Sequence, residues 1–353
     1  TNNSDNNNKS TDDSNNNNST NNNNSTNDDV AGQNSSGSTD QSADDDDDDD
    51  DQLLLYQTGF KNVEASSLHL LASQGINKIK IKSANVLFDN ANSNEDNWLS
   101  VSFNGNDQIK FENEENYIRN DYILINGAKS FFNYDSFSDK FNFNNYVFTN
   151  IVSNKLGFNE NSNLINQNGA SIGYFGKMKY YNVLFTEIIA DVGFNDNKVK
   201  KDIIKYLDNN NRSFKNIQTG LLLRTGLDIK LFDLIKIEPS VITSYNLINT
   251  TDSNNYIDKF LNIVPTLKLS LEFNNSFNIG LLVSDTLISN LSNKQITIND
   301  LTTELKNEKN LTEVKLNIQK NLLNNKLSFF GNVGLTDIST SDIGFDLGLR
   351  YSF

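Results

Sequence analysis

Cysteine is absent from this 353-residue sequence, and histidine, tryptophan and methionine occur once each. Without cysteine, disulfide frameworks, thiolate metal sites and cysteine nucleophiles are excluded. His69 is the only histidine, so metal sites built from several His or Cys ligands are excluded as well. We therefore expect no cofactor and no metal site.

A basic surplus and a long apolar run are also missing. Lys and Arg number 30 against 45 Asp and Glu, which gives a formal net charge of -15 at pH 7. Without a stripe of Lys and Arg to neutralise phosphates, we expect no nucleic-acid binding. The mean hydropathy is -0.55, and no stretch approaches the roughly 20 apolar residues of a membrane-spanning helix.

The negative charge is concentrated in residues 1–52. This segment holds fourteen Asp and one Lys, and its only apolar side chains are Val30 and two Ala. Folding it would bury too little apolar surface to offset the loss of chain entropy, so we expect a disordered acidic tail. The eight aspartates at 44–51 repel one another and predict an extended spacer.

From about residue 95 onward, apolar residues recur at every second position. In 343–353 every odd position is apolar and every even position is small or polar. One face of such a strand must meet an apolar medium and the other a polar one. Counting back from Phe353 predicts twelve strands, at 97–112, 119–132, 143–156, 168–178, 181–194, 215–229, 234–247, 261–272, 276–289, 311–321, 326–337 and 343–353.

Alternation alone fits both a soluble β-sandwich and a transmembrane β-barrel. The segments run for about 10 to 15 residues, against about 5 to 6 in the usual globular strand. Tight connections near 177–179, 231–233, 273–275 and 323–325 alternate with long polar ones at 195–213, 248–259 and 290–309. This rhythm and the even strand count favour an all-β fold, an antiparallel transmembrane barrel. Aromatic residues near the strand ends predict interface girdles: Tyr180, Tyr181, Phe185, Phe232, Phe260, Phe273, Phe277, Tyr351 and Phe353.

The chain thus divides into an acidic tail (1–52), a linker (53–93) and a barrel domain (94–353). In the linker, residues 63–72 predict a short helix that could thread the lumen. Residues 76–88 fit a strand at least as well. We therefore expect either a short lumen helix or a short strand before the barrel.

Charged residues at polar strand positions are expected to face the lumen or its rim. They are Glu187, Asp191, Arg224, Asp228, Lys268, Glu272, Glu313, Lys315 and Arg350. No nucleophile and base can be paired from their spacing, and His69 is expected to be a surface or lumen residue. We therefore expect a lumen network of ion pairs and no enzyme activity.

The C-terminal strand carries a specific signature: Asp346, Gly348, Leu349, Tyr351 and the terminal Phe353. It resembles the assembly signal of Gram-negative outer-membrane barrels, which is read by the barrel-assembly machinery. With about 260 residues behind a low-complexity stretch, 94–353 is similar to the β-domain of an autotransporter of type V secretion.

That resemblance implies an outer-membrane translocator and anchor, with a helix in its lumen leading to an exported N-terminal passenger. Its partners would be outer-membrane lipid, the barrel-assembly machinery and its own passenger, and a monomer is expected. The tail would be exposed at the cell surface. Residues 1–93 lack the repeats of a typical passenger, and the chain begins at Thr1 without Met or a leader, so we expect a mature form or a fragment. A porin-like outer-membrane channel is the first alternative, and a soluble β-sandwich adhesin module is the second.

Overall fold

The computed structural model describes most of the chain from Ala65 onward. The described residues are 65–90, 97–110, 117–135, 140–158, 161–200, 213–232, 234–251, 256–273, 276–291, 295–298, 301–304, 311–323, 326–337 and 342–353. The expectations for the tail (1–52) and for residues 53–64 lie outside them.

The described elements are one helix followed by strands. In chain order they are α2 (Ala65–Asn90), β1 (Asn97–Lys110), β2 (Tyr117–Asp135), β3 (Phe141–Phe158), β4 (Asn161–Tyr180), β5 (Leu184–Val199), β6 (Ser213–Leu227), β7 (Ile229–Leu231), β8 (Ile235–Thr251), β9 (Tyr256–Phe273), β10 (Phe277–Asn290), β11 (Gln295–Ile298), β12 (Leu301–Glu304), β13 (Leu311–Leu322), β14 (Leu327–Asp337) and β15 (Asp342–Ser352).

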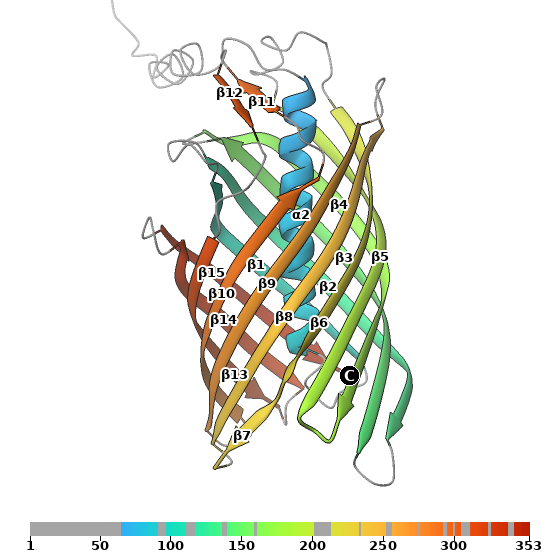
Figure 1. Ribbon diagram of the computed structural model, residues 1–353, viewed down its shortest axis with the longest axis vertical. Helices are drawn as coiled ribbons and strands as arrows, with labels where there is room; N and C mark the ends of the chain where they lie inside the picture. Colours follow the sequence, from blue (N-terminus) through green and yellow to red (C-terminus); the bar gives the residue numbers. More distant parts are fainter. Residues whose placement is uncertain are drawn as a thin grey trace, which may run out of the picture. The chain divides into compact units, whose positions relative to one another are not determined.

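Twelve long strands close into one antiparallel barrel (Figure 1). Successive long strands are paired, β6 pairs with β8, and β1 pairs with β15. The short β7 continues the line of β6 along β8, and β11 and β12 pair with each other. The predicted twelve-stranded β-barrel is confirmed, and the sandwich alternative is wrong because the ladder of strands closes on itself.

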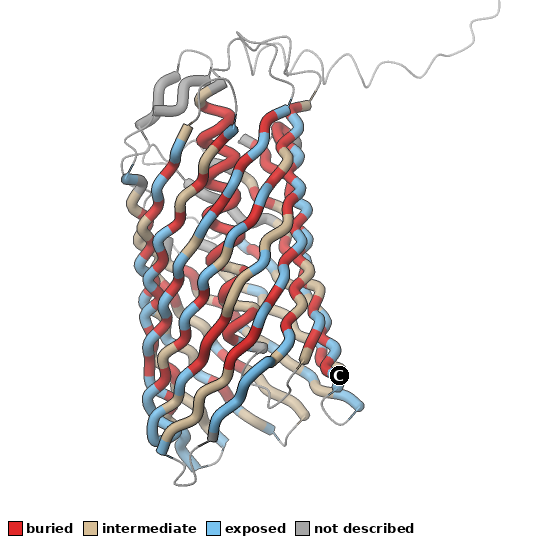
Figure 2. The backbone as a smooth tube through the Cα atoms, turned by 90° about the vertical axis from the view of Figure 1, so that its right-hand side faces the viewer, coloured by how far each residue is buried: buried red, intermediate tan, exposed pale blue. Residues whose placement is uncertain are grey.

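The outer wall of the barrel is apolar. Exposed and buried residues alternate along the strands (Figure 2), as in β6, whose pattern runs from exposed Ser213 to exposed Leu227. At one level, five outward side chains from neighbouring strands are cross-strand neighbours: Leu269, Leu281, Leu316, Val333 and Phe345, each at least 36% exposed. A closed barrel with such a belt is suited to contact with lipid.

Replacing Leu281 by arginine is expected to destabilise the barrel in a bilayer by about 2–4 kcal/mol, because the guanidinium would face hydrocarbon. Urea unfolding in lipid vesicles measures the loss. Leu322→Arg is the matched control, at the last residue of β13 and 40% exposed; near the interface it should lose about 0–1 kcal/mol. Equal losses would mean that Leu281 is not central in the belt.

The two ends of the barrel differ in their connections. At the end that carries the C-terminus, short turns join the strands, and Tyr181 and Asn182 have positive φ of 52° and 54°. The Val183 N–H donates to the Tyr180 carbonyl oxygen at 3.2 Å, so this is a type I′ turn. The longer gaps, such as 200–212 between β5 and β6, lie at the opposite end.

Two predicted connections are wrong. Residues 177–179 belong to β4, because Lys177 faces inward and Met178 outward in continued alternation. Most of 248–259 is strand, since β8 runs to Thr251 and β9 begins at Tyr256. Polar side chains do not end these strands because the lumen accepts them: the Asn216 amide donates to Thr250 Oγ1 at 2.6 Å.

The girdle prediction also needs correction. Phe185 and Phe260 are buried inside, so they do not contribute to a girdle. The side chains of Tyr180, Tyr181, Phe232, Phe273, Tyr351 and Phe353 are all exposed, near the end with the short turns.

Helix α2 runs along the inside of the barrel (Figure 1). The strand alternative for 76–88 is wrong, and the helix is longer than the expected 63–72. An unpaired strand in the lumen would leave its backbone groups without partners, whereas a helix satisfies them internally. Among the described residues, no helix is both long and apolar enough to cross a bilayer.

Candidate functional site: the lumen and its helix

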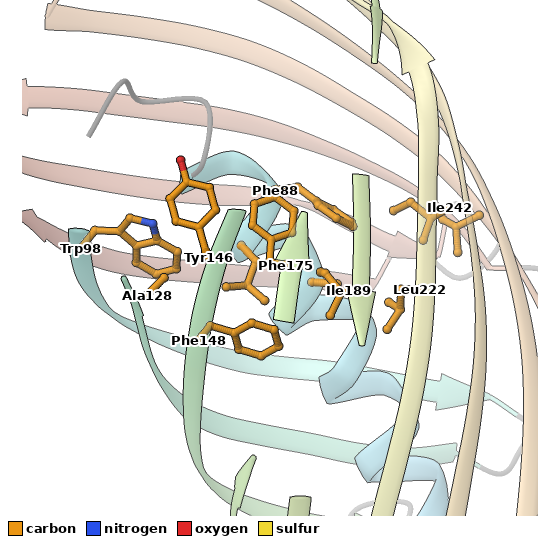
Figure 3. Close-up of a cluster of buried hydrophobic side chains, with 12 residues drawn as sticks. Phe88, Trp98, Ala128, Tyr146, Phe148, Phe175, Ile189, Leu222 and Ile242 are labelled. Carbon is orange, nitrogen blue, oxygen red and sulfur yellow. The ribbon is translucent and has the colours of Figure 1, made fainter. Parts of the chain in front are cut away.

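The N-terminal part of helix α2 is enclosed on all sides. Every residue from Ser67 to Ile81 is buried, and α2 contacts strands β2 to β6, β8, β9 and β11. Near the C-terminal end of the helix, Ala84, Leu87 and Phe88 join an apolar cluster with wall residues that include Trp98 and Phe175 (Figure 3). A segment of the same chain therefore occupies the lumen.

The direction of α2 is fixed by contacts at its two ends. The His69 ring lies 4.5 Å from that of Phe214 and 5.1 Å from that of Tyr256, between ring centroids. These residues stand at the starts of β6 and β9, at the end with the long connections. At the other end Asp89 accepts from Lys268 Nζ at 2.8 Å. The chain thus enters at the long-connection end and leaves toward β1.

Amide side chains bind the middle of the helix. Asn77 of α2 is fully buried and lies between Asn246 and Asn262. Asn246 donates to the Asn77 side-chain oxygen at 2.8 Å, and Asn77 donates to that of Asn262 at 3.0 Å. One turn earlier the Gln167 amide donates to the Ala72 carbonyl at 3.3 Å. Such neutral contacts seal the lumen without burying a charge.

Ion pairs join residues 80–89 of the helix to three different strands. They are Lys80 to Asp191 of β5 at 2.7 Å, Lys82 to Glu313 of β13 at 3.0 Å, and Asp89 to Lys268 of β9 at 2.8 Å. The side chains of Lys80 and Asp191 are both only 6% exposed. A buried pair of this kind depends on both partners, because removing one leaves a desolvated charge.

A chain of seven charges with alternating sign lines the wall; six lie on β4, β5, β6 and β8, and Asp228 lies between β6 and β7. Its successive contacts are Lys179–Asp228 (3.0 Å), Asp228–Lys236 (3.4 Å), Lys236–Glu238 (2.7 Å), Glu238–Arg224 (3.5 Å), Arg224–Glu187 (3.1 Å) and Glu187–Lys177 (3.0 Å). The Arg224 guanidinium also lies 5.3 Å from the centroid of the Phe88 ring. Each carboxylate therefore has two cations beside it, which compensates its desolvation.

The structure divides the nine charges expected in the lumen or at its rim into four groups. Glu187, Arg224 and Asp228 belong to the alternating chain; Asp191, Lys268 and Glu313 bind α2; Lys315 and Arg350 line a cavity beside α2. Glu272 lies at the rim, 35% exposed and 3.9 Å from Lys230.

Sequence reasoning missed the helix lysines Lys80 and Lys82 and the wall lysines Lys177, Lys179 and Lys236. The alternation of inward and outward positions would have identified Lys236. It would also have identified Lys177 and Lys179, once 177–179 was assigned to β4.

His69 is buried in the lumen, among aromatic rings. In the described part of the chain, no group of three or more His, Cys, Asp or Glu side chains is placed to hold a metal ion. The arrangement has the properties of a plugged pore, in which polar contacts hold the plug.

Four of the five residues of the C-terminal signature lie on β15, the strand that closes the barrel, and Phe353 directly follows it. Asp346 accepts from the Asn104 amide of β1, and Leu349, Tyr351 and Phe353 point outward and are exposed. The Phe353 N–H donates to the Asn97 carbonyl at 3.1 Å.

Gly348 lies opposite Phe330 of β14. Phe330 and Gly331 interrupt the alternation of β14, and the Phe330 side chain faces the lumen over Gly348.

Gly348→Val is expected to destabilise the barrel by about 1–3 kcal/mol through overpacking. A Cβ at this position would overlap the Phe330 ring. Thermal unfolding in detergent measures the effect. In a Phe330→Ala background the same change should be tolerated, because the ring is gone. If the losses in stability caused by Gly348→Val and Phe330→Ala simply add in the double variant, overlap with the Phe330 ring is not the cause.

Comparison with known proteins gives fold-level matches. No family model and no curated protein matches this chain. The transport unit of the autotransporter AIDA-I from Escherichia coli superimposes with a TM-score of 0.54 at 15% identity, covering 74% of this chain and 91% of that one. The β-domain of the Bordetella autotransporter BrkA gives 0.50 at 9% identity, covering 73% and 98%. The translocator domain of NalP from Neisseria meningitidis gives 0.48 at 10%, covering 80% and 98%.

The superpositions on the AIDA-I and BrkA domains, at 15% and 9% identity, show a shared fold and no more. The predicted resemblance to autotransporter β-domains is confirmed at that level: the chain folds as a barrel similar to the AIDA-I transport unit.

Proposed function

We propose that this chain is the translocator and anchor of an autotransporter in an outer membrane. The observation that supports the proposal best is the path of α2. The chain enters the barrel at the end with the long connections, passes through the lumen, and continues into β1 at the other end. In this arrangement, whatever precedes α2 emerges at the long-connection end, which is the extracellular end in barrels of this type.

In this proposal the barrel does no covalent chemistry and needs no cofactor. The apolar belt holds it in lipid, and the lumen accommodates the N-terminal part of the chain during export. Amide side chains such as Asn77, Asn246 and Asn262 then retain the last segment as a plug. Folding and assembly of the barrel would supply the energy, with the barrel-assembly machinery as partner and a monomer as the working unit.

Site-specific proteolysis on intact cells tests the proposal. A protease site inserted after residue 52 should be cut by protease added outside. A site at 201–212 is the positive control, and a site at 274–275 should be protected. If the 201–212 site is cut while the site after residue 52 is protected, the translocator proposal fails and the channel alternative gains support.

A further inference from the structure

An open groove of about 480 Å³ lies in the outer wall of the barrel, across strands β6, β8, β9 and β10. Its volume falls within the roughly 300–1,000 Å³ of ligand pockets. Two rows of outward side chains, aligned by the register of the strands, line it: Leu227, Pro239, Leu267 and Val283, and then Thr225, Val241, Pro265 and Asp285. With strands about 4.8 Å apart, the groove spans roughly 14 Å. It can therefore receive an extended hydrocarbon chain.

Both prolines of the chain lie in this groove. In the described ladders, Pro265 and Val264 lack partners on β10, although the register is the same on both sides of the gap. Pro239 lies at a second gap of this kind, between β8 and the line of β6 and β7. Proline has no N–H to donate and is therefore uncommon inside a sheet. The wall thus lacks ladder hydrogen bonds on both flanks of the groove, and two compact rings stand between these gaps.

Asp285 places a carboxylate at one end of the groove, on the outer face of β10. The neighbouring outward positions of this strand, Val283 and Leu287, are apolar. Thr312 of β13 donates its hydroxyl to Asp285 Oδ1 at 3.3 Å, and no Lys or Arg of the described chain forms an ion pair with this carboxylate. An ionisable side chain on a lipid-facing wall is costly unless a partner compensates it. The groove is therefore complementary to an apolar molecule that carries a cation at one end.

The groove slopes across the wall. Leu227 lies four positions from Leu231 at the end with the short turns, and Asp285 lies eight positions from Phe277 at the same end. For strands that rise about 3.3 Å per residue and tilt by about 40°, eight positions correspond to roughly 20 Å of an apolar band about 25 Å tall. The carboxylate thus lies near one membrane interface, and the rest of the groove lies deeper in the apolar band.

We propose that this groove binds a membrane lipid whose head group carries an amine, with the ammonium group at Asp285 and an acyl chain in the groove. An ammonium group has three N–H donors. These can bind the Asp285 carboxylate and a backbone carbonyl that the N–H-less Pro265 leaves without its usual donor. The proposal concerns the outer wall and depends neither on passenger export nor on the plug.

Native mass spectrometry of the full chain in a non-ionic detergent tests this proposal. Phosphatidylethanolamine and phosphatidylglycerol with the same acyl chains are the probes, and only the first carries an amine. One phosphatidylethanolamine per barrel should bind at saturation, about tenfold more tightly than phosphatidylglycerol, the usual effect of one charged hydrogen-bonding group. If neither lipid binds saturably, or if both bind equally, the proposal is overturned. It is also overturned if a second copy of the chain occupies the groove in place of lipid.

Asp285→Asn should weaken the binding of phosphatidylethanolamine about tenfold and leave that of phosphatidylglycerol unchanged. Asp121→Asn is the matched control, because this carboxylate of β2 lies away from the groove and already pairs with Arg119 at 2.9 Å. Slower migration on heating in SDS gels verifies that each variant folds. Equal affinity for phosphatidylethanolamine in a folded Asp285→Asn barrel would overturn the role of Asp285.

Val241→Trp tests the groove itself and remains informative if Asp285→Asn does not fold. The larger side chain would fill the groove and should weaken the binding of both lipids at least tenfold. Val333→Trp is the matched control, since Val333 of β14 is 47% exposed, against 44% for Val241, and lies outside the groove. Unchanged lipid binding in Val241→Trp, or an equal loss in Val333→Trp, would contradict binding in this groove.

Discussion

Replacing Lys80 by methionine is expected to release the plug. Asp191 would then be a buried carboxylate without its cation, at 6% exposure, and breaking such a pair destabilises by about 3–5 kcal/mol. When α2 leaves the lumen, water hydrates Asp191, so the loss applies to the plugged state and not to the open barrel. The equilibrium should shift toward the open state by more than about a hundredfold. Single-barrel conductance in a planar bilayer measures this as the fraction of time spent open.

Two controls separate the plug from the wall. Lys80→Met combined with Asp191→Asn removes both charges and should restore the closed state to a large extent. Lys230→Met breaks an ion pair at the rim, where Lys230 is 60% exposed and 3.9 Å from Glu272, and should leave the conductance unchanged. If Lys80→Met opens no more often than the unmodified barrel, the pair does not hold the plug.

Trp98 provides an independent optical measurement. It is the only tryptophan, is 1% exposed, and lies in the apolar cluster that includes Phe88 of α2. Departure of the helix would expose its indole to water. The emission of the Lys80→Met variant should therefore shift to longer wavelength, together with the rise in conductance.

The sequence predicts the wall of this molecule well because the wall obeys one simple constraint. Each strand separates lipid from a wet lumen, so residues such as Leu347 and Leu349 face outward while Arg350 and Asp346 face inward. Alternation records this constraint directly. It also fixes the number of strands, since each crossing has its own run of alternating residues.

The plug helix is less predictable because it does not separate lipid from the lumen. A helix on a surface shows an apolar stripe, but α2 is surrounded by wall and buries both Ile79 and Lys80. Its pattern therefore has no dominant face, and 76–88 fits a strand equally well.

The spacing of residues in the sequence also does not predict how the charges pair, because the pairing depends on how α2 is rotated in the lumen. Lys80 and Asp191 are separated by 111 positions. The sequence thus predicts many of the inward-facing charges of the wall, but not which of them meet the helix.

Replacing Phe353 by serine is expected to lower the amount of barrel in the outer membrane by about ten- to a hundredfold. The backbone of this residue is held by β1, since its N–H donates to the Asn97 carbonyl and the Asn97 amide donates to its carbonyl at 3.2 Å. The ring is not needed for that pairing: it is 65% exposed and stacks on Tyr351 with centroids 6.1 Å apart. Losing an aromatic ring from lipid, or from a receptor for the terminal strand, removes about 1.5–3 kcal/mol. Quantitative blotting of purified membranes measures the level.

Phe232→Ser distinguishes these two causes. Phe232 is 92% exposed in the turn between β7 and β8, and it carries the same ring as Phe353 away from the terminal strand. If the ring acts through lipid, both variants should fall to similar levels. If the assembly machinery reads the terminal strand, only Phe353→Ser should fall, and the purified variant should still refold in detergent like the unmodified chain. Unchanged membrane levels of Phe353→Ser would contradict both, and would mean that backbone pairing between β15 and β1 is sufficient for insertion.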